Sequence, residues 1–414
     1  MRPRWSALAP WALFASVCAA VTGWSALSGG FAFTDYDHEA APAFGALAHG
    51  DLSGFVSAVP SYGGSFVLRA PFALLAGLMG AGENGVFVAV ALPGLIGVVV
   101  LVTRLAATAR GRGWPVWGCV GLIGAIVAGQ STVNSLSFGH AEELLVSALA
   151  IGAVLAARSG REWTAGVLLG LAVAGKQSAV VAAPVVLIAF PRLPWRAALA
   201  AALSSGAVLA PLALAARGFA HAGALSATDL GGIFKPAQVW WFLGHHDVVP
   251  GHPGFRIGPS WLDGVVRPLL VASAAACALV WRRLPRRADL LGLLALVFLL
   301  RCVLDPWNNV YYHAPFLLAL AAWEAHCARR APWATLAAAL ALRFSFEFVP
   351  TFASPDGEAA AYLAWAVPAT ALLALAVFAP GAASRLGGRA AALLRRALPT
   401  LGRQLGDRPA QLGV

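Results

Sequence analysis

Charged residues are scarce in this chain of 414 residues: they make up 11% of it, whereas 59% of the residues are hydrophobic. A soluble domain carries about 25% charged residues, so this composition excludes an ordinary soluble protein and indicates an integral membrane protein. Carboxylates are scarcer than cations, with 18 Asp and Glu against 29 Lys and Arg, which gives a net charge of +11. The cations occupy short loops between apolar runs, and this favours contact with lipid head groups over nucleic-acid binding.

Cysteine motifs, nucleotide-binding motifs and internal repeats are also lacking. The five cysteines lie in or beside apolar segments, and none has CxxC spacing, so the sequence predicts neither a disulfide framework nor a zinc site.

The first residues, MRPRW, precede an apolar run that reaches about residue 30 without a persuasive small-x-small cleavage site. We interpret this run as a first membrane span with its N-terminus inside, not as a signal peptide.

The charges separate by membrane side once the basic loops are assigned to the cytoplasm, as the positive-inside rule requires. The alternate loops then hold most of the carboxylates and all the histidines except His326. This distribution predicts a polytopic protein of the plasma membrane with both termini cytoplasmic and its chemistry on the extracytoplasmic side. The basic loops contain Arg104, Arg110 and Arg112; Arg158 and Arg161; Arg192 and Arg196; Arg282, Arg283, Arg286 and Arg287; and Arg329 and Arg330.

The apolar runs predict an all-α bundle of about twelve transmembrane helices with additional helices in the extracytoplasmic loops, because a span needs about 20 apolar residues. One domain is expected over residues 1–380, with long outer loops at about 31–85 and 217–262, and a basic cytoplasmic tail over 381–414. The run at 67–81 is assigned to a helix on the outer face, since counting it as a span would invert every later loop. The expected spans are about 10–30, 86–104, 115–130, 143–158, 163–175, 178–190, 197–216, 264–281, 288–302, 313–327, 332–346 and 360–379.

Three carboxylates, Asp35, Asp37 and Glu39, follow the first span within five residues. Charges at a membrane edge are costly unless they are solvated, paired or used, and crowding raises a carboxyl pKa and favours a general base. The alternative is a solvated loop start, with Thr34 or Asp35 as an N-cap.

The outer segment at 130–143 ends in His140, Glu142 and Glu143. This His-x-Glu-Glu cluster is weak evidence for a metal site, and the alternative is that the two glutamates stabilise the N-terminus of the next helix. Lys176, which precedes Gln177, stands between two short apolar runs. A lone lysine at membrane depth is expensive and usually functional, and a phosphate is a natural partner for it.

Two later outer segments carry further polar residues. The loop at 217–262 contains His245, His246 and Arg256, where His-His-Asp is a candidate metal or anion site. Around residue 305, Arg301 has an alternative role as an i,i+4 partner of Asp305. Arg343 is expected near the outer face. The remaining candidates at this end are Asn308, Asn309, Tyr312 and His313.

With these residues in view, the chain resembles GT-C fold glycosyltransferases, in particular glycosyltransferase family 87, the polyprenyl-phosphate-mannose-dependent mannosyltransferase group. Three stretches carry the resemblance: Asp35 to Pro71, Gly139 to Pro184, and Asp305 to Pro315. Two departures concern Glu39, where the family often has Asp-x-x-x-Tyr, and Leu68-Arg69-Ala70-Pro71, which replaces an aromatic-Pro-Pro element. The first departure leaves open whether Asp35 or Asp37 is the base.

The resemblance implies inverting transfer of a hexose, with mannose as the family expectation, from a polyprenyl-phosphate donor to a cell-envelope glycan or glycolipid. Asp35 or Asp37 is then the catalytic base. This chemistry needs no nucleotide, and a divalent metal held by Asp35 and Asp37 stays open as a cofactor. The donor phosphate would be bound by Lys176, Arg301, Arg343 and His313. The sugar and acceptor would be bound by Glu39, His140, Glu142, Gln177, His245, His246, Arg256, Asp305, Asn308, Asn309 and Tyr312.

Two other functions remain as alternatives. A transporter or flippase of lipid-linked or polar envelope precursors would place its charges near the bilayer midplane, with Lys176 between two full-length spans and symmetry between the halves. A non-catalytic membrane scaffold would tolerate Asp35→Asn.

Overall fold

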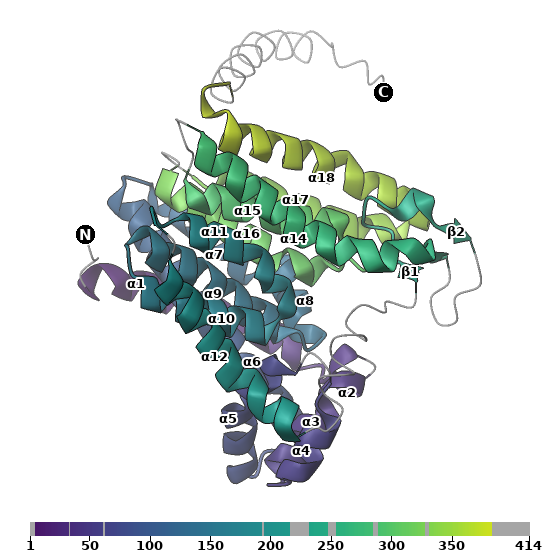
Figure 1. The fold of residues 1–414 in the computed structure, drawn as a ribbon. Helices are drawn as coiled ribbons and strands as arrows, with labels where there is room; N and C mark the ends of the chain where they lie inside the picture. The colour runs from purple at the N-terminus through teal and green to yellow at the C-terminus, as the bar shows by residue number, and fades with distance from the viewer. Residues whose placement is uncertain are drawn as a thin grey trace, which may run out of the picture.

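The computed structural model describes residues 5–32, 34–60, 63–192, 194–215, 232–246, 254–284, 289–327 and 331–382. The described chain is almost entirely helical, as the apolar periodicity predicts (Figure 1). The α-helices are α1 Trp5–Leu27, α2 Asp35–Glu39, α3 Ala41–Ala48, α4 Leu52–Ala58, α5 Gly64–Leu78, α6 Glu83–Gly111, α7 Val116–Val127, α8 Gln130–Ser137, α9 Ala141–Arg158, α10 Glu162–Gly175, α11 Ala183–Ile188, α12 Trp195–Ala215, α14 Ser260–Arg283, α15 Leu290–Leu304, α16 Ala314–Cys327, α17 Trp333–Arg343 and α18 Pro355–Phe378.

Short irregular helices and one small sheet complete the described fold. The 3₁₀ segments are η1 Gln177–Ala182, η2 Trp241–Leu243, η3 Val310–His313 and η5 Val349–Thr351, and η4 Phe344–Phe348 is π-helical. The strands β1 Ile233–Phe234, β2 His245–His246 and β3 Arg256–Ile257 form an antiparallel sheet in the order β1-β3-β2, with Phe234 opposite Arg256.

Each expected span coincides with helical structure. Within the described residues, six stretches are long and apolar enough to cross a membrane: 6–27, 83–111, 116–137, 195–214, 260–283 and 355–378. Shorter apolar helices occur at 64–78, 162–175, 177–188 and 290–304. The protein is therefore a multi-pass membrane protein in which some expected spans are shorter than a full crossing.

The expected outer loop over 31–85 is itself mostly helical, with α2, α3, α4 and α5 gathered at one end of the molecule (Figure 1). The helix expected at 67–81 is present as α5, which begins at Gly64. The second expected loop, at 217–262, contributes the small sheet and the start of α14, and residues 216–231 and 247–253 lie outside the described residues. The basic tail from residue 383 also lies outside them.

Small residues let neighbouring helices approach closely. Gly166 and Gly170 on α10 face α12, where an added methyl group would overlap the carbonyl oxygens of Ala197 and Ala201. This G-x-x-x-G spacing is a common device for packing helices in lipid, where apolar burial alone does not hold them together. This close packing holds α10 against α12 and therefore positions Lys176, the residue that follows α10.

A candidate active site at the start of α9

A tight turn between α8 and α9 contacts α2, which belongs to the segment that follows the first helix. Gly139 has φ +85°, a conformation that favours glycine, and a side chain there would also collide with Tyr36. The amide of Tyr36 donates to the carbonyl of Phe138 over 3.1 Å. Through this turn, α2 and the first residue of α9 meet, although about a hundred residues separate them in sequence.

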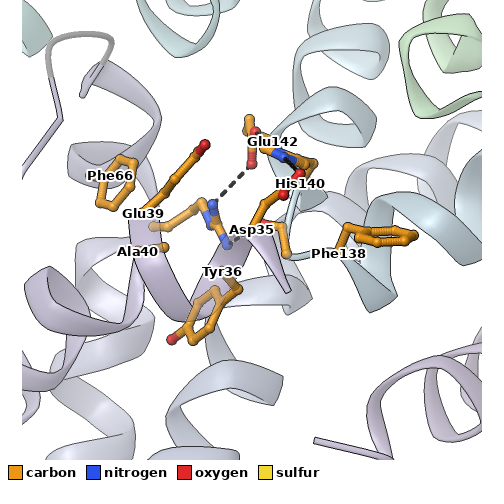
Figure 2. Close-up of a pocket in the computed structure, with 10 residues that line it drawn as sticks. Asp35, Tyr36, Glu39, Ala40, Phe66, Phe138, His140 and Glu142 are labelled. Atoms are coloured by element: carbon orange, nitrogen blue, oxygen red, sulfur yellow. Dashed lines mark hydrogen bonds and ion pairs between the residues drawn. The ribbon is translucent and has the colours of Figure 1, made fainter. Parts of the chain in front are cut away.

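The imidazole of His140 links two carboxylates at this junction. Its Nε2 lies 3.0 Å from Asp35 Oδ2 and its Nδ1 lies 2.8 Å from Glu142 Oε1. Both ring nitrogens donate only when the ring is protonated, so the geometry is that of an imidazolium between two acceptors. Figure 2 shows Asp35, His140 and Glu142 together at one side of a small pocket, which Glu39 and Phe66 also line.

Arg69 and Lys176 both form ion pairs with Glu142. Arg69 donates to Glu142 over 3.0 Å and to the carbonyls of Val90 and Gly139, and it is buried. The ammonium of Lys176 lies 3.5 Å from Glu142 and 2.8 Å from Glu143. These pairs compensate charges that would be very costly to bury alone.

The predicted interruption at Lys176 is present. Helix α10 ends at Gly175, Lys176 is extended with φ −153° and ψ 122°, and η1 begins at Gln177. Because the backbone leaves the helix here, the lysine side chain reaches Glu143 and also lies over the ring of Tyr312.

Arg301 closes the network from the end of α15. Its guanidinium lies 3.7 Å from Glu143 and 3.7 Å from Asp305, donates to the carbonyl of Tyr312, and stacks over the Tyr312 ring. The i,i+4 pairing of Arg301 with Asp305 that the spacing suggests is therefore present, together with the contact to Glu143.

Tyr311 joins the turn before α16 to the base candidate. Its hydroxyl donates to Asp35 Oδ2 over 3.3 Å, and its ring stacks on His140 with centroids 4.4 Å apart. The amide of Asn309 donates to the same hydroxyl over 2.9 Å. Asp35 is thus held by two donors from different parts of the chain, while its side chain remains 46% exposed.

These contacts set the charges of the pair. The hydrogen bond from His140 lowers the pKa of Asp35 below its ordinary value, with smaller contributions from Tyr311 and Lys235. Burial favours the neutral form of His140, but the charge of Glu142 and the bonds to both carboxylates outweigh it and raise the pKa of His140 to about 9. At neutral pH the carboxylate and the imidazolium are therefore both charged.

Several predicted residues lie elsewhere or have structural contacts. Asp37 does not line the pocket, and Gln177 is exposed. His313 is fully buried and lies 3.0 Å from the hydroxyl of Tyr362, within an aromatic cluster. Asn308 is buried and donates to the carbonyl of Ala237.

Two of the remaining candidates, Arg343 and Arg256, form ion pairs with acidic residues. Arg343 is exposed and pairs with Glu347. Arg256 binds Asp356 through two hydrogen bonds, which attaches the small sheet to the N-terminus of α18. His245 and His246 are exposed on β2, and the Asp247 of the suggested His-His-Asp site lies outside the described residues. Within the described ranges, no group of three or more His, Cys, Asp or Glu is arranged to hold a metal ion.

The sequence alone gives no site role to three residues of the cluster: Arg69, Tyr311 and Lys235. Arg69 carried a usable signal, since a charged residue within an apolar helix needs a partner. Glu143 was interpreted only as part of a cap or a weak metal cluster. Tyr311 and Lys235 depend on contacts with distant segments that spacing does not reveal.

Comparison with protein families gives one match: the sequence model described as glycosyltransferase family 87 covers residues 61–306. The matched region includes His140, Lys176 and Arg301, whereas Asp35 precedes it. Neither the comparison with curated proteins nor that with solved structures gave a match.

Proposed function

Because the chain belongs to glycosyltransferase family 87 and is therefore a membrane glycosyltransferase, we propose that it transfers a hexose from a polyprenyl-phosphate donor. Mannose is the first sugar to test, and the proposed acceptor is a cell-envelope glycan or glycolipid. The reaction is placed at the extracytoplasmic face of the plasma membrane and proceeds with inversion.

One observation carries this proposal: a half-exposed carboxylate, Asp35, lies at a pocket and is oriented by His140 and Tyr311. General base catalysis needs a carboxylate that is ionised, accessible and held in place. Asp35 meets all three conditions, whereas Asp37 lies outside the pocket lining. We therefore propose Asp35 as the base.

The chemistry is a single displacement. The acceptor hydroxyl attacks the anomeric carbon and passes its proton to Asp35, while the bond between the anomeric carbon and the phosphate oxygen breaks. The lipid phosphate leaves with the bonding electrons, and the configuration inverts. Stabilisation of the developing phosphate charge by fixed cations is the main contribution expected from the protein.

The network behind Asp35 has a positioning role in this scheme. Glu142 holds His140, and Arg69 and Lys176 hold Glu142. Of the predicted sugar contacts, Glu39, His140 and Glu142 line the pocket with Asp35. Asn309 is linked to Asp35 through the Tyr311 hydroxyl.

The helices beside Lys176 are shorter than the transporter alternative requires. It required Lys176 between two full-length spans, whereas α10 has 14 residues and η1 with α11 covers 177–188. Family membership independently favours an enzyme.

The test is transfer of radiolabelled sugar from polyprenyl-phosphate hexoses to envelope lipid extracts, with reconstituted wild-type protein, Asp35→Asn and Asp37→Asn. We expect Asp35→Asn to lower the rate at least about 100-fold, as is typical when a general base is lost, and Asp37→Asn to retain most of it. Equal rates for wild type and Asp35→Asn would reject Asp35 as the base. No transfer by folded wild-type protein from any donor would reject the proposed reaction.

A further inference from the structure

The cations at the centre of the network are already compensated. Arg69 pairs with Glu142, Lys176 pairs with Glu142 and Glu143, and Arg301 lies between Glu143 and Asp305. A departing phosphate monoester carries up to two negative charges. A cation next to a carboxylate stabilises the departing phosphate less than a cation with no carboxylate beside it, because the repulsion between the carboxylate and the phosphate offsets the attraction.

Lys235 differs from these cations in its partners. Its ammonium donates to the amide oxygen of Asn309, which is neutral, and lies 4.7 Å from the ring centroid of Trp307. Among the described residues, no carboxylate lies within ion-pair distance of it, and the charge of Asp35 acts on it from further away. Burial lowers the pKa of Lys235 from its ordinary value, and the charge of Asp35 offsets this effect only in part. Arg267, partly buried on α14, is likewise influenced by the charge of one carboxylate, Asp305.

The segment that carries Lys235 is fixed to the turn that precedes α16. The Lys235 amide donates to the carbonyl of Pro306 over 3.1 Å, and the Val239 amide donates to the carbonyl of Val303 over 3.0 Å. The indole of Trp240 donates to the carbonyl of Leu304 over 2.8 Å. This anchoring removes much of the conformational freedom that a lysine on an outer loop would otherwise lose on binding a ligand.

Lys235 and Asp35 are connected through two side chains. Lys235 binds the Asn309 amide oxygen, the Asn309 amide nitrogen donates to Tyr311, and Tyr311 donates to Asp35. An inverting displacement needs its base and its leaving group on opposite sides of one sugar ring. A cation and a carboxylate that are close but not in contact provide this arrangement.

We propose that Lys235 binds the phosphate of the lipid donor directly and neutralises it as it leaves, which makes Lys235 a catalytic residue. This inference rests on the proposed glycosyl transfer and adds to it the residue that receives the phosphate. On phosphate binding, the ammonium exchanges the neutral Asn309 oxygen for an anionic one, and Asn309 is released to contact the sugar.

The experiment measures phosphate binding separately from transfer. Purified full-length protein in detergent is titrated with decaprenyl phosphate, and with decaprenol as the uncharged control, while tryptophan fluorescence is recorded. Trp307 beneath Lys235 is the expected reporter. The variants are Lys235→Gln, Lys235→Met, which keeps the aliphatic stem over Trp307, and Lys235→Arg. Arg104→Gln removes the same charge at an exposed position on α6, and thermal unfolding checks the fold of each protein.

We expect Lys235→Gln and Lys235→Met to weaken decaprenyl phosphate binding about 10- to 100-fold, the range for a lost charge-assisted hydrogen bond. Decaprenol binding should not change, Lys235→Arg should stay within about threefold of wild type, and Arg104→Gln should match wild type.

Wild-type affinity for decaprenyl phosphate in folded Lys235→Gln and Lys235→Met would overturn the proposal, even if transfer were reduced. So would a wild-type protein that does not discriminate decaprenyl phosphate from decaprenol. If Asp35→Asn binds decaprenyl phosphate normally but transfers nothing, the base assignment stands independently of Lys235. Failure of the wild type to transfer sugar, with phosphate binding that depends on Lys235, would reject the reaction and retain the phosphate site.

Discussion

At the scale of single residues, the contact between Asp35 and His140 makes each charge depend on the other. The imidazolium keeps the carboxylate ionised, and Asp35 and Glu142 keep the imidazolium protonated. In the proposed reaction, His140 acts through Asp35 and is a positioning residue.

This coupling predicts the pH dependence of transfer. The raised pKa of His140 means that its stabilising charge is complete below the ordinary histidine value and is lost as the pH rises through about 9. The lowered pKa of Asp35 means that its charge is complete above the ordinary aspartate value and is lost only as the pH falls below it. Transfer should therefore be constant near neutrality and decline on the alkaline side near pH 9.

His140→Gln checks the assignment. Without the imidazolium, the alkaline decline should disappear and the acid decline should move to higher pH, because Asp35 loses the donor that lowers its pKa. The measurement is kcat/KM against pH for both proteins. An alkaline limb that persists unchanged in His140→Gln would assign it to another group.

The sequence indicates candidate site residues, but it does not indicate how they contact one another. The charge of Lys176 within apolar sequence and the crowding of Asp35, Asp37 and Glu39 were visible signals. Asp35 pairs with His140, and Lys176 pairs with Glu143. Because the partners of each pair are far apart in sequence, their spacing does not predict the contact, and only the folded structure shows it. Arg343 is expected near the outer face because it stands late in the apolar run at 332–346, and nothing in the sequence distinguishes it from a surface partner of Glu347.

At the scale of helices, close approach of α10 and α12 positions Lys176. The sequence predicted the helices themselves, including the interruption between residues 175 and 177, because apolar runs and charged loops mark the limits of membrane segments clearly. It did not predict which helices adjoin, since an apolar surface in lipid selects no neighbour by hydrophobicity.

Gly166→Ala tests this packing. Its methyl group would overlap the Ala197 carbonyl, and overpacking of this kind costs about 1–3 kcal/mol. We expect a lower thermal unfolding temperature in detergent and reduced transfer, because Lys176 moves with α10. Gly206→Ala on α12 is the matched control, since nothing lies within 4 Å of the added carbon. Equal unfolding temperatures for the two variants would show that close contact at Gly166 is unimportant.

At the scale of the whole molecule, the segregation of charge predicts that the site faces away from the cytoplasm. Ser53 on α4 is exposed and lies in the same expected outer loop, 31–85, as Asp35. Cys327 is exposed at the end of α16, next to the basic loop at 329–330. The two positions should therefore lie on opposite sides of the membrane.

A membrane-impermeant thiol reagent provides the test. In intact cells, Ser53→Cys in a Cys327→Ala background should be labelled, whereas Cys327 in the wild-type chain should be labelled only after permeabilisation. The reverse pattern would invert the topology and place the site on the cytoplasmic side.

The shortness of α10 has a consequence for the surrounding lipid. Fourteen residues at about 1.5 Å each rise about 21 Å, less than the roughly 30 Å of a typical hydrocarbon layer. If α10 starts at the cytoplasmic boundary, the bilayer must thin locally by several ångströms, or Lys176 must lie below the general surface level. For the proposed polyprenyl-phosphate donor, either case would draw the polar group inward while the isoprenoid tail stays in the acyl chains. Membrane thickness thereby becomes part of what determines access to the enzyme.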